Sequence, residues 1–506
     1  MRLPIGIQDF VRIREEDCVY VDKTMHMMPF LSGGAFFLSR PRRFGKSLLL
    51  STLRAIFQGR KDLFAGLWLE QHHDFAPRPI IRLDMSALDY QARSLEESLL
   101  EDLRRIAREY QVEVRQNTAK SVFEELIRAL AQTAKVVVLI DEYDKPITDY
   151  LSHAEKRASH QETLKSLYGV LKPLDAYLHL VLLTGVSKIG KLSLFSDLNN
   201  LQDISLNTKY ATLCGYTKPE IEQSFPSYIS AFAQAMGMTH DVFIEQITFW
   251  YNGYSWDGIN RLYCPFSFLL LLEQQQFRSF WYESGTPTIL IKAIQQRQID
   301  PMLFEHCFLD SQSISVTDVS QLDPISLMFQ TGYLTIASTR NTPLGVRYDL
   351  TYPNQEVRLA FTTNLLLEYS GNLPSQISSF AVQLSEALSN LEWATFFGIC
   401  NRVIATVPYE IFPKQESYIH SLMHLLLTST GFKTHSQVQT SKGRMDTLVT
   451  TSSQSIIFEF KTKGTAKAAL RQIDTARYAD SLLGKVVKVG VVFDLEKKCI
   501  SGWAVG

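Results

Sequence analysis

The loop 40–47 has the residue types that could hold a phosphate chain. It reads Arg-Pro-Arg-Arg-Phe-Gly-Lys-Ser, follows a short apolar run and opens an apolar-periodic helix. Backbone N–H groups at that helix start would point at phosphate oxygens, Lys46 would neutralise charge between the terminal phosphates, and the Ser47 hydroxyl would ligate Mg²⁺. Arg40 stands where such loops usually carry a glycine, so a basic loop that merely ends in Gly-Lys-Ser is the structural alternative.

A second set of reactive side chains ends the apolar, β-branched run 136–140, where Asp141 and Glu142 follow directly. This pattern predicts a central parallel strand that is buried on both faces. Carboxylates at the carboxyl end of such a strand lie at the crevice where open α/β sheets bind ligands. We expect Asp141 to hold Mg²⁺ through water and Glu142 to activate the attacking water. A core strand with solvated acidic residues at its end is the alternative, which the pairing with Lys46 disfavours.

A third strand-like run, 178–187, places Thr184 where it could sense the terminal phosphate, although a Thr-Gly-Val-Ser turn cap explains the residue equally well. The basic residues Arg40, Arg42 and Arg43 are expected to add charge near the phosphates or to face an interdomain or intersubunit surface. The residues expected to contact ATP are Arg43, Phe44, Gly45, Lys46, Ser47, Leu48, Asp141 and Thr184, with Ser47 and Asp141 also at Mg²⁺.

The last ninety residues contain a separate group of charged side chains. Glu459 and Lys461 are two positions apart on the strand-like run 455–461, so they share a face, and Asp446 on the preceding hairpin strand could converge with them. Two carboxylates can hold a divalent metal, and a lysine beside them can orient a water for attack on phosphorus. Glu416 on a preceding helix and Gln472 on a following one favour this metal site over a charged edge hairpin.

Length and composition place the chain among ordinary globular proteins. The 506 residues exceed what one core usually supports, and a near balance of 51 basic against 52 acidic residues gives no bulk electrostatic case for nucleic acid or membrane. Six cysteines without paired spacing indicate free thiols. Apolar runs too short for a bilayer, without a secretory leader pattern, predict a cytoplasmic protein with no membrane segment.

Strands alternating with helices in the first half predict an α/β fold, a P-loop NTPase parallel sheet with helices on both faces. The aromatic stretch 201–288 predicts a packed helical region rather than a nucleic-acid platform, because no basic cluster accompanies it. Strand-like runs follow, including 326–337, and a Pro-bounded junction near Pro413 suggests a boundary. The expected domains are 1–215 (P-loop), 216–410 (mainly helical, with a small winged or β-containing part) and 411–506 (α/β, restriction-endonuclease-like).

Over nearly its full length the chain resembles the bacterial and archaeal AAA-ATPase-like family, whose members join a divergent P-loop ATPase to a C-terminal nuclease-superfamily domain. Members of that family usually lack a glycine at the position of Arg40. The chain has Cys264-Pro265-Phe266 where members usually read Asn-Pro-Trp, a change that touches packing. The likeness rests on 3–6, 20–24, 40–47, Ile140-Asp141-Glu142-Tyr143-Asp144-Lys145-Pro146, Thr184-Gly185-Val186-Ser187-Lys188, 198–205, 250–254, 263–267 and Pro353-Asn354-Gln355-Glu356-Val357.

The C-terminal part resembles the PD-(D/E)XK superfamily through Asp446 and Glu459-Phe460-Lys461, a short motif shared by active nucleases and inactive binding modules. The leading hypothesis is an ATPase, with ATP and Mg²⁺ as cofactors, whose nucleotide state controls a metal-dependent nuclease acting on nucleic acid. Glu142, Asp446, Glu459 and Lys461 are its expected catalytic residues. The alternative is an ATP-driven regulatory switch with an inactive C-terminal binding module; a metabolic kinase is less favoured. The oligomeric state, a homo-oligomer included, stays open.

Overall fold

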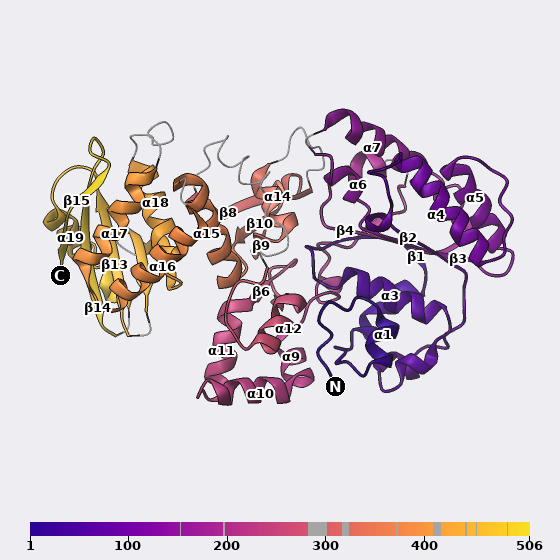
Figure 1. Ribbon diagram of the computed structural model, residues 1–506, viewed down its shortest axis with the longest axis horizontal. Coiled ribbons are helices and arrows are strands. Elements are labelled where there is room, and N and C mark those ends of the chain that lie inside the picture. Colours follow the sequence, from indigo (N-terminus) through magenta and orange to yellow (C-terminus); the bar gives the residue numbers. More distant parts are fainter. Residues whose placement is uncertain are drawn as a thin grey trace. The chain divides into compact units, whose positions relative to one another are not determined.

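The computed structural model describes residues 1–151, 153–195, 198–281, 301–315, 323–370, 373–407, 416–440, 443–451, 453–482 and 484–506 (Figure 1). These residues form two compact units. Unit 1 comprises Met1–Arg278 with Phe308–Asp349, and unit 2 comprises Ser279–Cys307 with Leu350–Gly506. The three-part division expected from the sequence stays a prediction, and its junction near Pro413 lies outside the described residues.

Unit 1 is built on a five-stranded parallel sheet in the order β2-β3-β4-β1-β5, as the strand and helix pattern predicts. The strand carrying the phosphate-loop sequence, β1, lies between β4 and β5, so the acidic strand β3 is one strand removed from it. The strands are β1 (Gly34–Ser39), β2 (Ile80–Asp84), β3 (Val136–Asp141), β4 (Leu178–Gly185) and β5 (Gln202–Asp203).

Helices cover both faces of this sheet, with α1 and α3 on one side and α4, α5 and α7 on the other (Figure 1). Local sequence starts them: the Ser94 hydroxyl accepts from the Glu97 N–H in a capping box, and the Thr118 hydroxyl caps the next helix. The helices are α1 (Phe10–Glu15), α2 (Met28–Leu31), α3 (Lys46–Phe57), α4 (Leu95–Glu109), α5 (Ala119–Leu130), α6 (Lys145–Thr148), α7 (Ala154–Tyr168) and α8 (Lys191–Leu194). Short 3₁₀ turns are η1 (Thr24–Met27), η2 (Lys61–Phe64), η3 (Trp68–Gln71), η4 (Met85–Ala87), η5 (Asp175–Tyr177) and η6 (Thr208–Tyr210).

The rest of unit 1 is helical and aromatic, as expected, and several of its rings are buried in packing: Tyr251, Tyr254 and Tyr263 are each at most 1% exposed. It contains α9 (Lys218–Ser224), α10 (Pro226–Ala235), α11 (His240–Tyr251), β6 (Asn252–Tyr254), β7 (Leu262–Tyr263) and α12 (Pro265–Gln274). The second segment adds the sheet β8-β10-β9, with β8 (Cys307–Asp310), η9 (Ser313–Ser315), α14 (Pro324–Thr331), β9 (Thr335–Thr342) and β10 (Gly345–Thr351).

The strand-like interpretation of 326–337 is wrong in its first half, which is helix α14. Asp323 caps that helix by accepting from the Ser326 N–H, Pro324 occupies its first turn, and Gly332 ends it at φ 89°. An apolar run of this length does not by itself distinguish a buried strand from a buried helix, and the capping residues decide it.

Unit 2 is centred on the sheet β11-β12-β13-β14-β15, in which only β13 and β14 run parallel. Ile473 of α19 packs with Ile457 on one face, while Phe396 of α17 contacts Phe458 on the other, so helices cover both faces. The elements are η8 (Pro301–Glu305), α15 (Gln355–Ser370), α16 (Pro374–Ser389), α17 (Trp393–Thr406), α18 (Glu416–Ser429), β11 (Lys433–Thr440), β12 (Gly443–Thr450), β13 (Ser455–Lys461), α19 (Ala466–Thr475), η12 (Tyr478–Ser481), β14 (Val486–Asp494) and β15 (Cys499–Val505).

Candidate functional site

The phosphate-type loop joins β1 to α3, with Gly45 at the helix N-cap in a left-handed conformation, φ 90°. That backbone angle, rather than lack of space, requires glycine, since a Cβ there would meet nothing within 4 Å. The side chain of Lys46 is buried and its Nζ donates to the carbonyls of Arg40 and Pro41, each at 2.9 Å. Burial lowers the pKa of Lys46, and the nearby carboxylates of Asp141 and Glu142 oppose that shift.

Arg40 neither extends toward the helix start nor faces an exposed surface, which corrects the expectation that it adds charge near the phosphates or faces an interdomain or intersubunit surface. Its guanidinium is buried and donates to the carbonyls of Ser39, Ser205 and Tyr210 at 2.7–3.1 Å, and it lies 4.2 Å from the ring centre of Trp256. Arg40 therefore stabilises the base of the loop from within the protein.

The other two arginines of the loop differ from Arg40 and from each other. Arg42 is exposed, whereas Arg43 is half-buried with its guanidinium 3.7 Å from the ring centre of Phe266. Arg43 also adopts φ 68°, which is uncommon for a residue with a side chain. Phe44 is buried, and Ser47 and Leu48 are half-buried in the first turn of α3.

The acidic strand places its two carboxylates at the same edge of the sheet as the loop. Asp141 is 1% exposed, and its Oδ1 accepts from the Thr184 hydroxyl at 2.6 Å and from the Glu142 N–H at 3.1 Å. Glu142 has a left-handed backbone, φ 51°. Burial raises the pKa of Glu142, with Lys46 opposing the shift. The structure thus brings Lys46, Asp141, Glu142 and Thr184 into one neighbourhood.

Two further residues that the site assignment from sequence missed hold the loop after β4. Asp144 is buried, and its carboxylate accepts from the Val186 N–H at 3.2 Å and from both the N–H and hydroxyl of Ser187 at 2.8 and 2.7 Å. The Tyr143 hydroxyl donates to the Ser187 carbonyl at 3.0 Å. Gly185 is required there, because a Cβ would lie 2.5 Å from the Tyr143 ring. Their signal in the sequence was their place in the stretch 140–146.

An apolar pocket adjoins the loop. Phe44, Gly45 and Leu48 form one wall, and residues of the N-terminal segment and of 213–216 form the others, among them Tyr20 and Tyr216. At its edge Lys23 is held by both carboxylate oxygens of Glu220, at 2.6 and 2.7 Å. Unit 1 therefore has an apolar recess beside a cationic, carboxylate-flanked loop.

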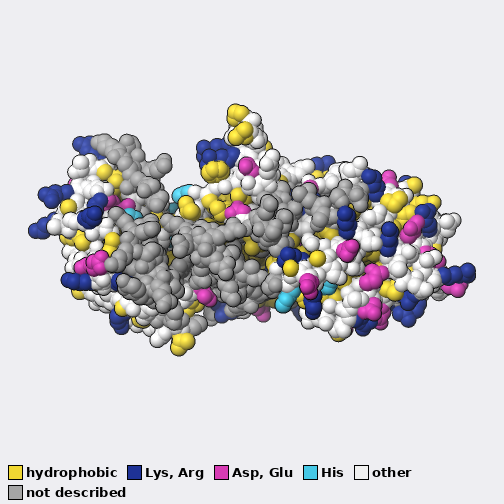
Figure 2. All heavy atoms as spheres, turned by 90° about the horizontal axis from the view of Figure 1, so that it is seen from above, with side chains coloured by type: hydrophobic (Ala, Val, Ile, Leu, Met, Phe, Trp, Pro, Cys, Tyr) yellow, Lys and Arg dark blue, Asp and Glu magenta, His cyan; other side chains and the backbone are white. Residues whose placement is uncertain are grey.

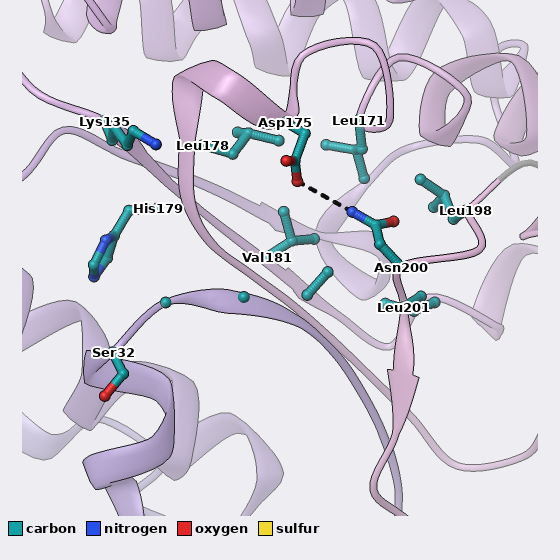
Figure 3. Close-up of a pocket in the computed structure, with 13 residues that line it drawn as sticks. Ser32, Lys135, Leu171, Asp175, Leu178, His179, Val181, Leu198, Asn200 and Leu201 are labelled. Carbon is teal, nitrogen blue, oxygen red and sulfur yellow. Dashed lines mark hydrogen bonds between the residues drawn. The ribbon is translucent and has the colours of Figure 1, made fainter.

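A larger cavity of about 290 Å³ lies at the opposite end of the strands, where β1 and β4 begin (Figure 3). Asp175 and Asn200, joined by a 3.1 Å hydrogen bond, face it together with Lys135 and His179. The phosphate-type loop and the carboxylates of β3 are at the carboxyl ends of their strands, so this cavity belongs to a different region of unit 1.

In unit 2 the predicted acidic residues meet at the end of the β12–β13 pair. Thr447 pairs with Phe458, so the register places Asp446 beside Glu459, and Asp446 Oδ2 accepts from the Phe460 N–H at 2.9 Å. Lys461 Nζ lies 3.6 Å from Glu459 Oε1. The structure therefore brings Asp446, Glu459 and Lys461 together.

Comparison with known proteins gives one family match for the N-terminal part of the chain and another for the C-terminal part. Residues 4–195 match the family described as Predicted AAA-ATPase, and residues 414–503 match the PD-(D/E)XK nuclease superfamily. A protein of Azotobacter chroococcum mcd 1, described as an uncharacterized protein in the vnfD 5′ region, is 35% identical over 520 residues, which cover 100% of this chain and 98% of that relative. The chain belongs to the AAA-ATPase-like family. Its C-terminal part is a PD-(D/E)XK superfamily domain.

In the PD-(D/E)XK motif of this AAA-ATPase-like protein, the pKa of the Glu459 carboxyl is shifted well above its ordinary value. Glu459 is 1% exposed, and its Oε2 has no hydrogen-bond partner among the described residues. Burial and then repulsion by Asp446 raise the pKa of Glu459 to about 7, while Lys461 opposes the shift. A buried carboxyl with an unpaired oxygen next to a half-buried one is an arrangement that a divalent cation would stabilise.

The donor set fits a partly hydrated ion. In the part of the chain that the structure describes, no three His, Cys, Asp or Glu side chains are close enough to enclose a metal. Two carboxylates with water and substrate phosphate filling the remaining positions is the usual environment of Mg²⁺. The side chain of Glu416, expected nearby, lies outside the described residues, and Gln472 is half-buried on α19.

His420 is a residue of this site that the sequence argument missed. It follows Glu416 by one helical turn on α18, and its Nδ1 lies 3.9 Å from Asp446 Oδ1. Its ring centre is 5.5 Å from that of Phe460. The spacing 416, 420 in an amphipathic helix was the available signal.

The surface charge and the hydropathy of the helices give no further indication of the protein's function. On the face in Figure 2, basic and acidic side chains are interspersed over the described surface, in keeping with the near-zero net charge. Among the described helices, none combines the length and apolar character needed to cross a bilayer.

Proposed function

We propose that unit 1 binds ATP with Mg²⁺ and hydrolyses it, and that unit 2 cleaves phosphodiester bonds of nucleic acid under control of the nucleotide state. The observation that carries the first part is Lys46, a buried ammonium at a helix start beside Asp141 and Glu142. A buried cation on one side, with carboxylates one strand away that could hold Mg²⁺ on the other, suits the binding of a nucleotide phosphate chain.

In the proposed ATP reaction each residue has a distinct task. Lys46 would neutralise negative charge on the terminal phosphates, and Ser47 and Asp141 would hold Mg²⁺. Glu142 accepts the proton of the attacking water, a role its raised pKa supports. Thr184, already bonded to Asp141, fixes that carboxylate and faces the terminal phosphate. Bound Mg²⁺ supplies charge neutralisation between the phosphates.

In unit 2 the pair Asp446–Glu459 supports metal-assisted phosphodiester cleavage. The two carboxylates would hold Mg²⁺, which polarises the scissile phosphate when bound. Lys461 is 28% exposed and 3.6 Å from Glu459, so its ammonium can reach a water without being a metal ligand. Its task in the proposal is to orient that water and stabilise negative charge as it develops on phosphorus.

Two variants and one control test the roles in unit 1. Lys46→Ala should abolish ATP binding, while Glu142→Gln should bind ATP and fail to release phosphate, because only Glu142 acts on the water. Lys120→Ala, an exposed lysine of α5, should behave as wild type. Equal loss of binding in Lys46→Ala and Glu142→Gln would contradict the separation of roles.

The test for unit 2 uses labelled single- and double-stranded DNA and RNA with Mg²⁺ or Mn²⁺, each with and without ATP. Asp446→Asn should lose metal binding and cleavage together, whereas Lys461→Ala should bind metal and cleave on the order of a hundredfold more slowly. Lys463→Ala, exposed two residues later, is the control. No cleavage by the wild type under any nucleotide condition would leave an ATP-driven switch with an inactive binding module.

A further inference from the structure

The second segment of unit 1, residues 308–349, contacts the loop that follows β4. Gln330 of α14 is 5% exposed, and its Oε1 accepts from the Lys188 N–H at 2.7 Å. Its Nε2 donates to the Ser326 hydroxyl at 3.2 Å. Lys188 follows Ser187, which Asp144 holds from the other side. The loop that follows Thr184 is therefore held by Asp144 on one side and by Gln330 of α14 on the other.

A second set of contacts joins the same segment to the phosphate-type loop. The ring of Phe44 meets those of Tyr254 and Trp256 edge-on, at 4.7 and 5.1 Å. Between these two aromatic residues, Ser255 exchanges hydrogen bonds with the Thr335 hydroxyl of β9: its N–H donates at 2.7 Å and its carbonyl accepts at 3.0 Å. The loop after β4 thus contacts the 308–349 segment directly, and the phosphate-type loop contacts it through residues 254–256.

Arg261 strengthens the second connection. Its guanidinium donates to the carbonyls of Ile336 and Ala337 on β9, at 2.7 and 2.6 Å. Gly258, in the same turn, packs against Ser338 so closely that a Cβ would lie 3.2 Å from the Ser338 Cα. The turn after β6 and strand β9 are therefore joined by hydrogen bonds and by close backbone packing.

The chain enters and leaves this segment at the division between the units. Unit 2 gives way to unit 1 after Cys307, and strand β10 carries the chain back across the division between Asp349 and Leu350. Helix α15 begins at Gln355, only four residues after β10 ends. A displacement of 308–349 would therefore be delivered through the backbone to both of its junctions with unit 2.

We propose that the 308–349 segment reads the nucleotide state of unit 1, with Gln330 as the positioning residue that couples it to the loop after β4. This regulation rests on the ATP-binding function proposed above. A nucleotide that shifts Thr184 or Phe44 changes the positions of Lys188 and Ser255, and each shift is passed on through one of the two contacts. Loss of the amide of Gln330 removes one contact without touching a residue of the ATP site.

The experiment is hydrogen–deuterium exchange of the full chain with and without Mg²⁺ and a non-hydrolysable ATP analogue. In the wild type, peptides covering 44–50 and 324–342 should both exchange more slowly on binding, by on the order of fivefold or more. Gln330→Ala should keep the protection at 44–50 and an analogue affinity within about twofold, and lose the protection at 324–331. Gln330→Glu, which retains an acceptor for the Lys188 N–H, should restore it.

The controls separate this inference from the proposed function. Gln312→Ala, an exposed position in the same segment, should respond as wild type. Protection at 44–50 without any change at 324–342 in the wild type would overturn the coupling and leave ATP binding intact. Absence of protection at 44–50 would overturn both. Unaltered protection at 324–331 in Gln330→Ala would refute the role of Gln330. If that variant does not fold, Thr335→Val, which removes the hydroxyl that bonds Ser255, should lose the protection at 335–342, and unaltered protection there would overturn the coupling.

Discussion

The raised pKa of Glu459 predicts that Mg²⁺ binding to unit 2 expels a proton near neutral pH. Burial and the neighbouring Asp446 hold the pKa at about 7 without metal, whereas a carboxylate that ligates a cation must be ionised. With that pKa, about 0.9 proton is bound to Glu459 at pH 6 and about 0.1 at pH 8. Below pH 7 the apparent affinity for Mg²⁺ should fall about tenfold per pH unit.

Titration calorimetry of the full chain with Mg²⁺, in two buffers of different ionisation enthalpy, counts the protons released. The expected values are about 0.9 at pH 6 and about 0.1 at pH 8. Glu392→Gln, which removes an exposed carboxyl of unit 2, should leave both values unchanged. Because His420 lies 3.9 Å from Asp446, His420→Gln is the decisive variant: the proton count should persist there if Glu459 is the source. Equal counts at pH 6 and pH 8 would refute the reasoning.

The same carboxyl predicts a pH dependence of stability in the presence of a chelator. A carboxyl whose folded pKa is raised contributes stability that is complete below its unfolded pKa, here 4.5, and is lost as the pH rises through about 7. The shift corresponds to about 3 kcal/mol in the free energy of unfolding of unit 2. Urea denaturation at pH 4.5 and pH 8 should show this loss, Glu459→Gln should lack it, and Mg²⁺ should restore stability at pH 8. A Glu459→Gln curve parallel to that of the wild type would contradict it.

Two substitutions in unit 1 test how its loops are held. Gly185→Ala places a methyl group 2.5 Å from the Tyr143 ring and should lower the free energy of unfolding by about 1–3 kcal/mol, whereas Gly398→Ala, a helical glycine with open space, should raise it by about 0.5–1 kcal/mol; thermal denaturation compares them. Arg40→Lys loses the planar fork that donates to three carbonyls and should destabilise by about 2 kcal/mol, while Arg42→Lys, exposed, should stay within about 0.5 kcal/mol. Equal melting temperatures for the two arginine variants would contradict the buried role.

The sequence predicted the strands of the parallel sheet because their signal is local. The run 136–140 is continuously apolar and β-branched, which few environments other than a doubly covered strand tolerate. The end of such a strand then fixes where Asp141 and Glu142 must lie. Likewise the two-residue spacing of Glu459 and Lys461 determines their shared face without knowledge of the rest of the fold.

The function of Arg40 could not be read from its neighbours. Its carbonyl partners Ser205 and Tyr210 are more than 160 positions away in sequence, and Trp256 is farther still. A basic residue in a basic loop favours a charge-binding interpretation, and only the long-range packing shows a buried scaffold. His420 was not predicted as a site residue for a related reason, because its closeness to Asp446 depends on how α18 packs against β12.

Two residues near Lys46 have backbone angles that only surrounding contacts can maintain. Arg43 and Glu142, both L-residues, adopt φ 68° and 51°, and such conformations persist only where the surroundings determine them. Arg43 is fixed by Phe266 and by its carbonyl, which accepts from the Cys264 thiol. Glu142 is fixed by the carboxylate of Asp141, which accepts its N–H. The same Asp141 oxygen also accepts from the Thr184 hydroxyl. A cation that binds Asp141 would therefore alter the hydrogen bond that holds the Glu142 backbone. In this way the residue proposed to activate water is linked to the cation that the water must approach.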